Sequence, residues 1–166
     1  MKTLTLYQPH ADMAALGLKP YETRSWRTIK EIGKPLVIHS GKGGPKRLAL
    51  KEPFAPHYEI KDGKLVKPLR LGVCLAVVIV ESCAPARTVR EYLQHFVWNG
   101  TPEQKANTER ALAMGDFTDG RWAWKLKVLC TLENIFPISG ARLIWEVPSE
   151  TAKVIKAQCW EKGVKL

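Results

Sequence analysis

The chain has 166 residues, of which 45% are hydrophobic and 25% charged. This mixture is typical of a globular protein and excludes a disordered or fibrous chain. The longest apolar run, residues 71–80, is too short to span a membrane, and its β-branched residues predict a buried strand. The length predicts one domain, residues 1–166, and the first residues lack the apolar core of a signal peptide. We therefore expect a soluble cytoplasmic protein with no membrane partner.

The net charge of +10 is unevenly distributed along the chain. Residues 27–70 hold eleven Lys or Arg and four Asp or Glu, so this stretch carries +7 of the total. A positive field favours a polyanionic partner, nucleic acid first. The alternative is a solvated surface that only keeps the protein in solution. An acidic membrane is a weaker alternative, because no basic amphipathic helix or lipidation motif accompanies the charge.

Cysteine and histidine spacing gives no indication of a metal site. The cysteines contain no Cys-x-x-Cys pair, and we expect reduced, structural thiols at Cys74, Cys83, Cys130 and Cys159. The four histidines show no metal-ligand spacing either. The glycine-rich loop 41–45 lacks the Gly-Lys-Ser/Thr sequence of a phosphate-binding loop. We expect no metal and no cofactor. The sequence does not indicate an oligomeric state.

The first half of the chain predicts strands joined by short connections. Alternation at 3–8 predicts a strand that Pro9 ends, and residues 11–16 predict a short helix closed by Gly17. Further strands are expected at 21–26, 34–40 and 70–83. The basic, proline-broken segment 43–69 is interpreted as a surface excursion, with a helix near 46–50 and a turn at Asp62-Gly63.

The second half adds a helical insertion at 86–115 and two more strands. Residues 86–96 predict a helix, and Thr101-Pro102-Glu103-Gln104 starts a second helix with a capping box. Strands are expected at 120–133 and 143–147, an extended edge piece at 135–138, and a final helix at 149–162 capped by Ser149. This order predicts an α+β fold: a mainly antiparallel, curved sheet, interpreted as a β-barrel, flanked by helices.

The densest polar cluster lies in residues 19–26. On a strand, Glu22, Arg24 and Trp26 project to one face, and Lys19 lies at the turn into that strand. Such a face can hold a flat, polar ligand: the carboxylate accepts from an amine, the cations bind phosphate, and the indole stacks. The alternative is a structural Glu22–Arg24 ion pair. If the chain is an enzyme, the compact candidates for catalysis are Lys19, Glu22 and Thr23.

Several other polar or aromatic residues are candidates for the same ligand site. Gln8 ends the first predicted strand and His10 opens the next element, so both can reach the mouth of this site; the alternatives are a hydrogen bond to a neighbouring backbone amide for Gln8 and a structural role for His10. His39 and Lys42, at the end of the third strand, can extend the site as a phosphate-binding rim, and Trp122 is either a stacking platform or part of the core. Arg121, next to Gly120, either closes over a ligand or bonds a strand end. The candidates are Gln8, His39, Lys42, Arg121 and Trp122.

Ordered motifs across most of the chain resemble the ASCH domain family. The two motifs that carry the resemblance most specifically are LYQPHA at 6–11 and GLKPYETRSW at 17–26. The remaining ones are PLVIHSGK at 35–42, GRWAW at 120–124 and LIWE at 143–146. The resemblance leaves out residues 43–69 and 85–118.

The resemblance implies a PUA-like β-barrel whose helix-lined cleft binds RNA or nucleotides. Lys19, Glu22 and Arg24 match cleft positions, with Gln8, His39, Lys42 and Arg121 around them. Small bacterial members hydrolyse N4-acetylcytidine with a Lys, a Thr three positions later, and a Glu from elsewhere. Lys19 matches that Lys, but Glu22 occupies the Thr position and Thr23 follows it, on the other strand face. Some members are reported as ribonucleases.

Three functions remain open from the sequence. The leading one is a module that binds RNA, a single-stranded nucleic acid or a nucleotide. The second is a hydrolase acting on an N4-acylated cytidine-type nucleoside or on RNA. The third is a protein that binds a partner through helices at 86–114.

Overall fold

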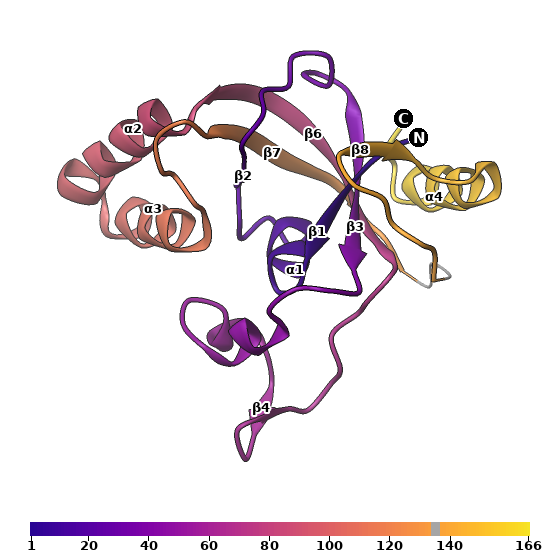
Figure 1. Ribbon diagram of the computed structural model, residues 1–166, viewed down its shortest axis with the longest axis horizontal. Coiled ribbons are helices and arrows are strands. Elements are labelled where there is room, and N and C mark those ends of the chain that lie inside the picture. The colour runs from indigo at the N-terminus through magenta and orange to yellow at the C-terminus, as the bar shows by residue number, and fades with distance from the viewer. Residues whose placement is uncertain (134–136) are drawn as a thin grey trace.

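The computed structural model describes residues 1–133 and 137–166, which form a six-stranded sheet with helices packed around it (Figure 1). The strand order is β2-β7-β6-β3-β1-β8, and every neighbouring pair is antiparallel except β1 and β3. The strands of this sheet are β1 Lys2–Tyr7, β2 Tyr21–Arg24, β3 Pro35–Gly41, β6 Cys74–Pro85, β7 Trp122–Thr131 and β8 Ile144–Glu146.

The α-helices occupy three different positions around this sheet (Figure 1). Helices α2 and α3 pack side by side at one end, α4 lies at the other end near both termini, and α1 lies against the middle of the sheet. Their bounds are α1 His10–Ala15, α2 Ala86–Asn99, α3 Pro102–Met114 and α4 Ser149–Glu161. In the described residues, no helix is both long and apolar enough to cross a membrane.

Side chains from both faces of the sheet are buried, which explains the continuous apolar run of β6. In β3, Leu36 and Ile38 pack in one cluster with Ala11 and Ala14 of α1. The intervening Val37 packs on the opposite face, in the cluster that contains Ile155 of α4. Alternation along the strand therefore divides the apolar side chains between two clusters on opposite faces of the sheet, one with α1 and one with α4.

The sheet is not closed into a barrel, so that part of the sequence prediction was wrong. In the described residues, β2 pairs only with β7, and β8 pairs only with β1, so both are edge strands. β8 has only three residues and covers β1 only from Lys2 to Leu4. The Thr5 carbonyl beyond it accepts a hydrogen bond from Arg24 of β2 at 3.1 Å instead.

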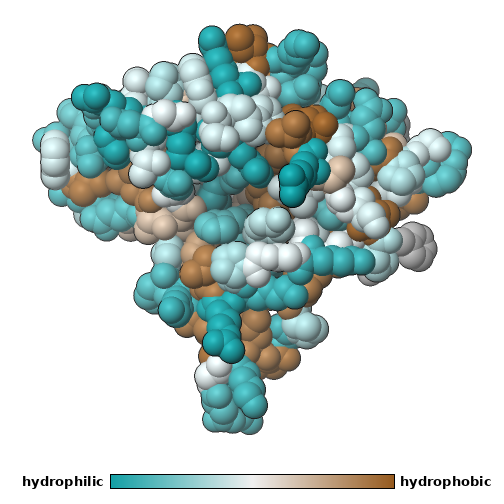
Figure 2. Space-filling view, viewed as in Figure 1, coloured by the Kyte–Doolittle hydropathy of each residue, from teal (hydrophilic) through white to brown (hydrophobic). Residues whose placement is uncertain are grey.

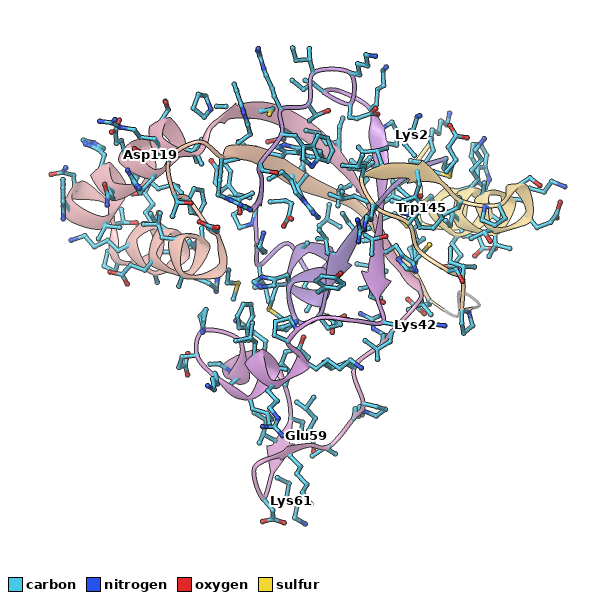
Figure 3. All side chains as sticks on the ribbon, in the orientation of Figure 1. Lys2, Lys42, Glu59, Lys61, Asp119 and Trp145 are labelled. Atoms are coloured by element: carbon cyan, nitrogen blue, oxygen red, sulfur yellow. The ribbon has the colours of Figure 1, made fainter. Side chains whose placement is uncertain are left out.

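The basic segment 43–69, called the arm below, projects from the body of the molecule (Figure 1). It contains two 3-10 helices, Lys46–Leu50 and Ala55–His57, and a hairpin of β4 Ile60–Lys61 and β5 Lys64–Leu65. Lys61 lies at its far tip (Figure 3). In Figure 2 this tip is hydrophilic, and hydrophobic side chains gather nearer the body.

The base of the arm is fastened to α1. Phe54 packs against Met13 of α1 and Met114 of α3. The buried Asp12 carboxylate accepts hydrogen bonds from the Tyr58 hydroxyl and from Arg70, both at 3.0 Å. These contacts connect the arm to the helix that precedes the polar cluster.

Element boundaries differ from the sequence predictions in a few places. The predicted strand 21–26 ends at Arg24, strand 120–133 begins at Trp122, and strand 70–83 is shifted to Cys74–Pro85. The capping box of α3 is confirmed by reciprocal hydrogen bonds between Thr101 and Gln104. The cap at Ser149 was wrong, because Pro148 precedes the helix and no side chain caps it. Part of the predicted edge piece 135–138 lies outside the described residues.

Candidate functional site

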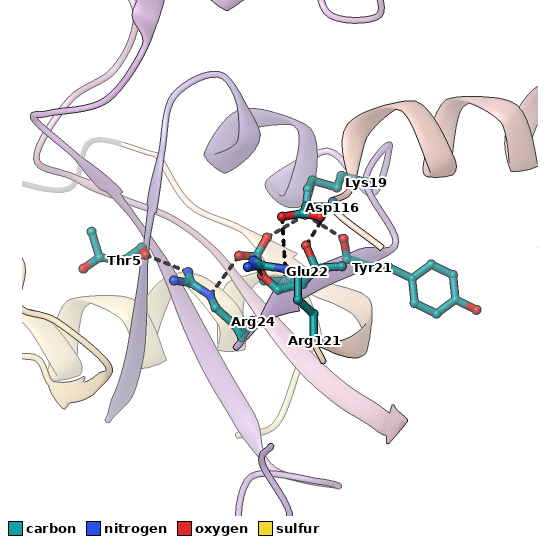
Figure 4. Close-up of polar contacts among 8 residues, drawn as sticks. Thr5, Lys19, Tyr21, Glu22, Arg24, Asp116 and Arg121 are labelled. Carbon is teal, nitrogen blue, oxygen red and sulfur yellow. Dashed lines mark hydrogen bonds and ion pairs between the residues drawn. The ribbon is translucent and has the colours of Figure 1, made fainter. Parts of the chain in front are cut away.

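The polar cluster predicted at residues 19–24 forms a connected row of charges (Figure 4). Lys19 Nζ lies 2.6 Å from Glu22 Oε2 and donates to the Tyr21 carbonyl, also at 2.6 Å. Glu22 Oε1 lies 2.9 Å from Arg24 Nε. Alternation along β2 puts Glu22 and Arg24 on one face, as predicted, and the turn after α1 brings Lys19 onto the same carboxylate.

This row is held in a largely dehydrated environment. The side chains of Lys19 and Glu22 are only 3% and 10% exposed, whereas Arg24 is 27% exposed. Burial by itself raises the pKa of Glu22, but the charges of Lys19 and Arg24 overcome it and hold the pKa below its ordinary value. Glu22 is therefore a carboxylate at neutral pH, and it is the acceptor at the centre of the row.

A second pair of charges faces the row from the loop between α3 and β7. Arg121 Nη2 donates to the Thr23 carbonyl at 3.0 Å, and its Nε lies 3.2 Å from Asp116 Oδ2. The Thr23 hydroxyl accepts from the Asp116 backbone N–H at 3.1 Å. The Thr118 hydroxyl donates to Asp116 and, together with the charge of Arg121, holds the pKa of that carboxyl below its ordinary value. These contacts fasten the loop to β2.

Both groups of charges line one cavity of about 450 Å³. It lies where the sheet fails to close, between the end of β1 and β2. Four cations and two carboxylates line it, so the lining carries an excess of positive charge, with the buried Glu22 carboxylate as an acceptor among the cations. The charged lining residues are Lys19, Glu22, Arg24, Asp116, Arg121 and Arg142.

His10 of α1 also lines this cavity. Its ring packs edge-on against Phe54 at 4.9 Å. Burial, and then the charge of Lys19, lower the pKa of His10, so that the imidazole is neutral at pH 7. It adds a polar but uncharged edge to the wall. The alternation of 3–8 and the helix start had placed His10 near the mouth, but a lone histidine gave no sign of its role.

The two tryptophans predicted as stacking platforms do not line this cavity. Trp26 packs edge-on against the buried Trp124, with ring centroids 4.5 Å apart, and it lines a separate hollow beside Arg27. Trp122 packs against the same core cluster, and the Arg27 guanidinium lies 5.1 Å from its ring centroid. The shortened β2 explains the first case, since Trp26 lies beyond the end of the strand.

Gln8 is fully buried and has structural contacts. Its side-chain nitrogen donates to the Arg70 carbonyl at 2.9 Å, and its oxygen accepts from the Asp12 N–H at 3.2 Å. Gln8 thus connects α1 to Arg70, the residue that follows the arm, and these backbone contacts agree with its structural alternative.

His39 and Lys42 line a second hollow of about 390 Å³. It shares Thr5, Tyr7, Ala141 and Arg142 with the first cavity, so the two hollows adjoin. His39 is 1% exposed, with Nδ1 3.3 Å from Thr5 Oγ1 and Nε2 3.3 Å from the Ile138 carbonyl. Burial lowers its pKa, which leaves His39 neutral at pH 7. The ring therefore positions the 138–140 backbone, while Lys42 supplies the charge.

Five of the predicted site residues line the first cavity: Lys19, Glu22, Thr23, Arg24 and Arg121. Lys42 and His39 line the adjoining hollow. Sequence reasoning missed cavity residues contributed by distant segments, namely Thr5, Tyr7, Met114, Asp116 and Arg142. No sequence pattern connected Tyr7 with the glycine-rich loop 41–44, which packs on its ring. In the described residues no cluster of three His, Cys, Asp or Glu side chains is placed to hold a metal ion.

Three solved structures are similar to this chain: the ASCH protein of Zymomonas mobilis and two single-residue variants of it. The first is 10% identical, with a TM-score of 0.47, over 94% of this chain and 93% of that chain. The variants have TM-scores of 0.45 and 0.42 at 10% and 9% identity, over 92% of this chain and 91% and 93% of theirs. These structures are of the family that the sequence motifs resemble. No protein-family model and no curated protein matches the chain.

Proposed function

We propose that the cavity beside β2 binds a nucleotide or a segment of single-stranded RNA. The observation that carries the proposal is the buried Lys19–Glu22–Arg24 row, which opens into a cavity of about 450 Å³. This volume is within the range of small-molecule sites, roughly 300–1,000 Å³. Burying such a charged row costs free energy, and an adjoining polar ligand offsets part of that cost.

The donors and the acceptor fit the edges of a nucleotide. Glu22 Oε2 accepts a hydrogen bond from Lys19 and Oε1 forms an ion pair with Arg24, and a carboxylate offers about four acceptor positions. Its remaining positions accept from the exocyclic amine of a base. Arg24 and Arg121 are partly exposed and donate to a carbonyl or a phosphate.

The excess of positive charge in the chain supports a polyanionic ligand. Residues 27–70, which include the arm, carry +7 of the net charge of +10. Lysines spread along the arm attract a nucleic-acid backbone over a Debye length and make its binding salt-dependent. The resemblance of the motifs to ASCH domains implies the same class of ligand.

Binding of a fluorescein-labelled RNA of ten mixed-sequence nucleotides, followed by fluorescence anisotropy, tests the proposal. We expect Arg24→Met to weaken binding at least about tenfold, since a lost hydrogen bond from a charged group costs about 1.5–3 kcal/mol. The matched control is Arg87→Met on α2, an exposed arginine that is also paired with a glutamate. Equal affinities for Arg24→Met and the wild type, with both folded by circular dichroism, would reject the cavity as the site.

A hydrolase is the second candidate, because Lys19 and Glu22 lie in contact at the cavity wall and Thr23 lines it too. Here Lys19 is the activated amine or general base, and Glu22 is its acid/base partner. The structure holds the Lys19 ammonium by hydrogen bonds to Glu22 and the Tyr21 carbonyl, which favours binding over proton abstraction. Incubation with N4-acetylcytidine and with RNA separates the candidates: turnover that Lys19→Met abolishes establishes the enzyme, and binding without turnover establishes the module.

A further inference from the structure

Tyr7, at the end of β1, lies at the junction of the two adjoining hollows. Its side chain lines both the cavity beside Glu22 and the hollow beside Lys42. Tyr7 remains 55% exposed even though it lines both hollows. Since Trp26 and Trp122 pack elsewhere, Tyr7 offers the open aromatic surface that a base needs at this site.

The glycine-rich loop after β3 supports one side of the Tyr7 ring. A Cβ at Gly41 would lie 3.0 Å from Tyr7 Cδ1, and one at Gly43 would lie 3.4 Å from Cε1. At Gly44, where φ is +92°, a Cβ would lie 2.5 Å from Tyr7 Cγ. The glycine backbone therefore packs directly on one side of the Tyr7 ring and fixes its orientation. The rest of the ring faces the two hollows.

The second hollow presents uncompensated positive charge. Lys42 and Arg142 line it, no carboxylate is among its lining residues, and neither cation forms an ion pair in the described parts of the chain. Lys42 lies just beyond the end of β3 (Figure 3). A Cβ at Gly72 would lie 2.8 Å from Lys42 Cε, so the lysine stem runs directly over the Gly72 backbone. Such a pair of cations suits a phosphate group.

We propose that the ligand is a strand of at least two nucleotides that crosses Tyr7. One base stacks on Tyr7 with its polar edge toward Glu22, and the adjoining phosphodiester lies between Lys42 and Arg142. The two hollows, about 450 and 390 Å³, each have room for one nucleoside and share Arg142 and Tyr7. This inference rests on the proposed function and names its ligand class: a phosphodiester-linked strand rather than a free nucleoside.

The test uses the same labelled RNA with the variants Tyr7→Leu, Tyr7→Phe and Lys42→Gln. Stacking on an aromatic ring contributes about 1–3 kcal/mol per base, so we expect Tyr7→Leu to weaken binding about tenfold or more. Tyr7→Phe keeps the ring and should bind within about twofold of the wild type. Lys42→Gln should lower the slope of log K against log salt by about one.

Matched controls are Tyr92→Leu, an exposed tyrosine on α2, and Lys127→Gln, an exposed lysine on β7. A competition experiment tests the ligand class. Dinucleoside monophosphates should displace the labelled RNA at concentrations at which nucleosides with the same bases do not. If Arg24→Met weakens binding while Tyr7→Leu and Lys42→Gln bind like wild type, this inference is overturned and the proposed function stands. If Arg24→Met also binds like wild type, both are overturned.

Discussion

Replacing Glu22 by Gln removes the negative charge at the centre of the buried row and keeps its shape. The change leaves the Lys19 ammonium, 3% exposed, without its counter-charge. Removing one partner of a buried ion pair typically costs about 3–5 kcal/mol. The amide oxygen still accepts one hydrogen bond from Lys19, and water reaches Arg24, so we expect the lower end of that range, about 3 kcal/mol.

The chain contains a matched surface pair for comparison. Lys153 and Glu150 are also separated by three residues and lie 2.9 Å apart, but their side chains are 74% and 79% exposed. Such exposed pairs contribute about 0–1 kcal/mol. We therefore expect Glu150→Gln to change the free energy of unfolding by less than about 1 kcal/mol.

Equilibrium unfolding in urea, followed by tryptophan fluorescence, measures both variants. For a chain of this size, a loss of about 3 kcal/mol lowers Tm by roughly 6–12 °C. The double variant Lys19→Met/Glu22→Gln should be less destabilised than the sum of the single ones, because it removes both buried charges. A cost for Glu22→Gln no greater than that for Glu150→Gln would refute the claim that this row is a buried, energetically coupled pair.

Three further predictions concern pH and packing. Folding lowers the pKa of Glu22, so the stability that its ionised form contributes is present above the unfolded-state pKa of 4.5 and is lost as pH falls below it. Glu22→Gln should therefore flatten the dependence of the free energy of unfolding on pH in this acidic range. The lowered pKa values of His39 and His10 mean that the unfolded chain binds these protons first, so stability falls as pH drops below 6.5. Urea titrations of His39→Gln should therefore lose part of that slope, with the His10 part remaining, while the exposed His95→Gln keeps the whole slope. Gly44→Ala, at φ +92° and against the Tyr7 ring, should cost about 1–2 kcal/mol or more in thermal unfolding, and an unchanged Tm would contradict the packing described for this loop.

The sequence predicted the polar row because its geometry is local. Glu22 and Arg24 are two residues apart on a strand, and Gly17, at φ +74°, closes α1 just before Lys19. The strongly periodic and β-branched segments also fixed most strands of the sheet. Capping at Thr101 was equally readable, since both partners lie within one turn.

The parts that failed depend on contacts between distant segments. Barrel closure requires the two edge strands, β2 and β8, to pair with each other, and only the folded sheet shows that in the described residues β2 pairs only with β7 and β8 only with β1. Trp26 looked like a fourth member of the polar face, but the strand ends at Arg24 and the ring packs on Trp124. Tyr7 depends on a loop 34 residues further along the chain, which periodicity cannot reveal.

The most direct test of the binding proposal is a crystal structure of the protein with a short single-stranded RNA. We expect a base in the cavity within hydrogen-bonding distance of Glu22 and Arg24. RNA bound elsewhere on the surface, with that cavity empty, would contradict it.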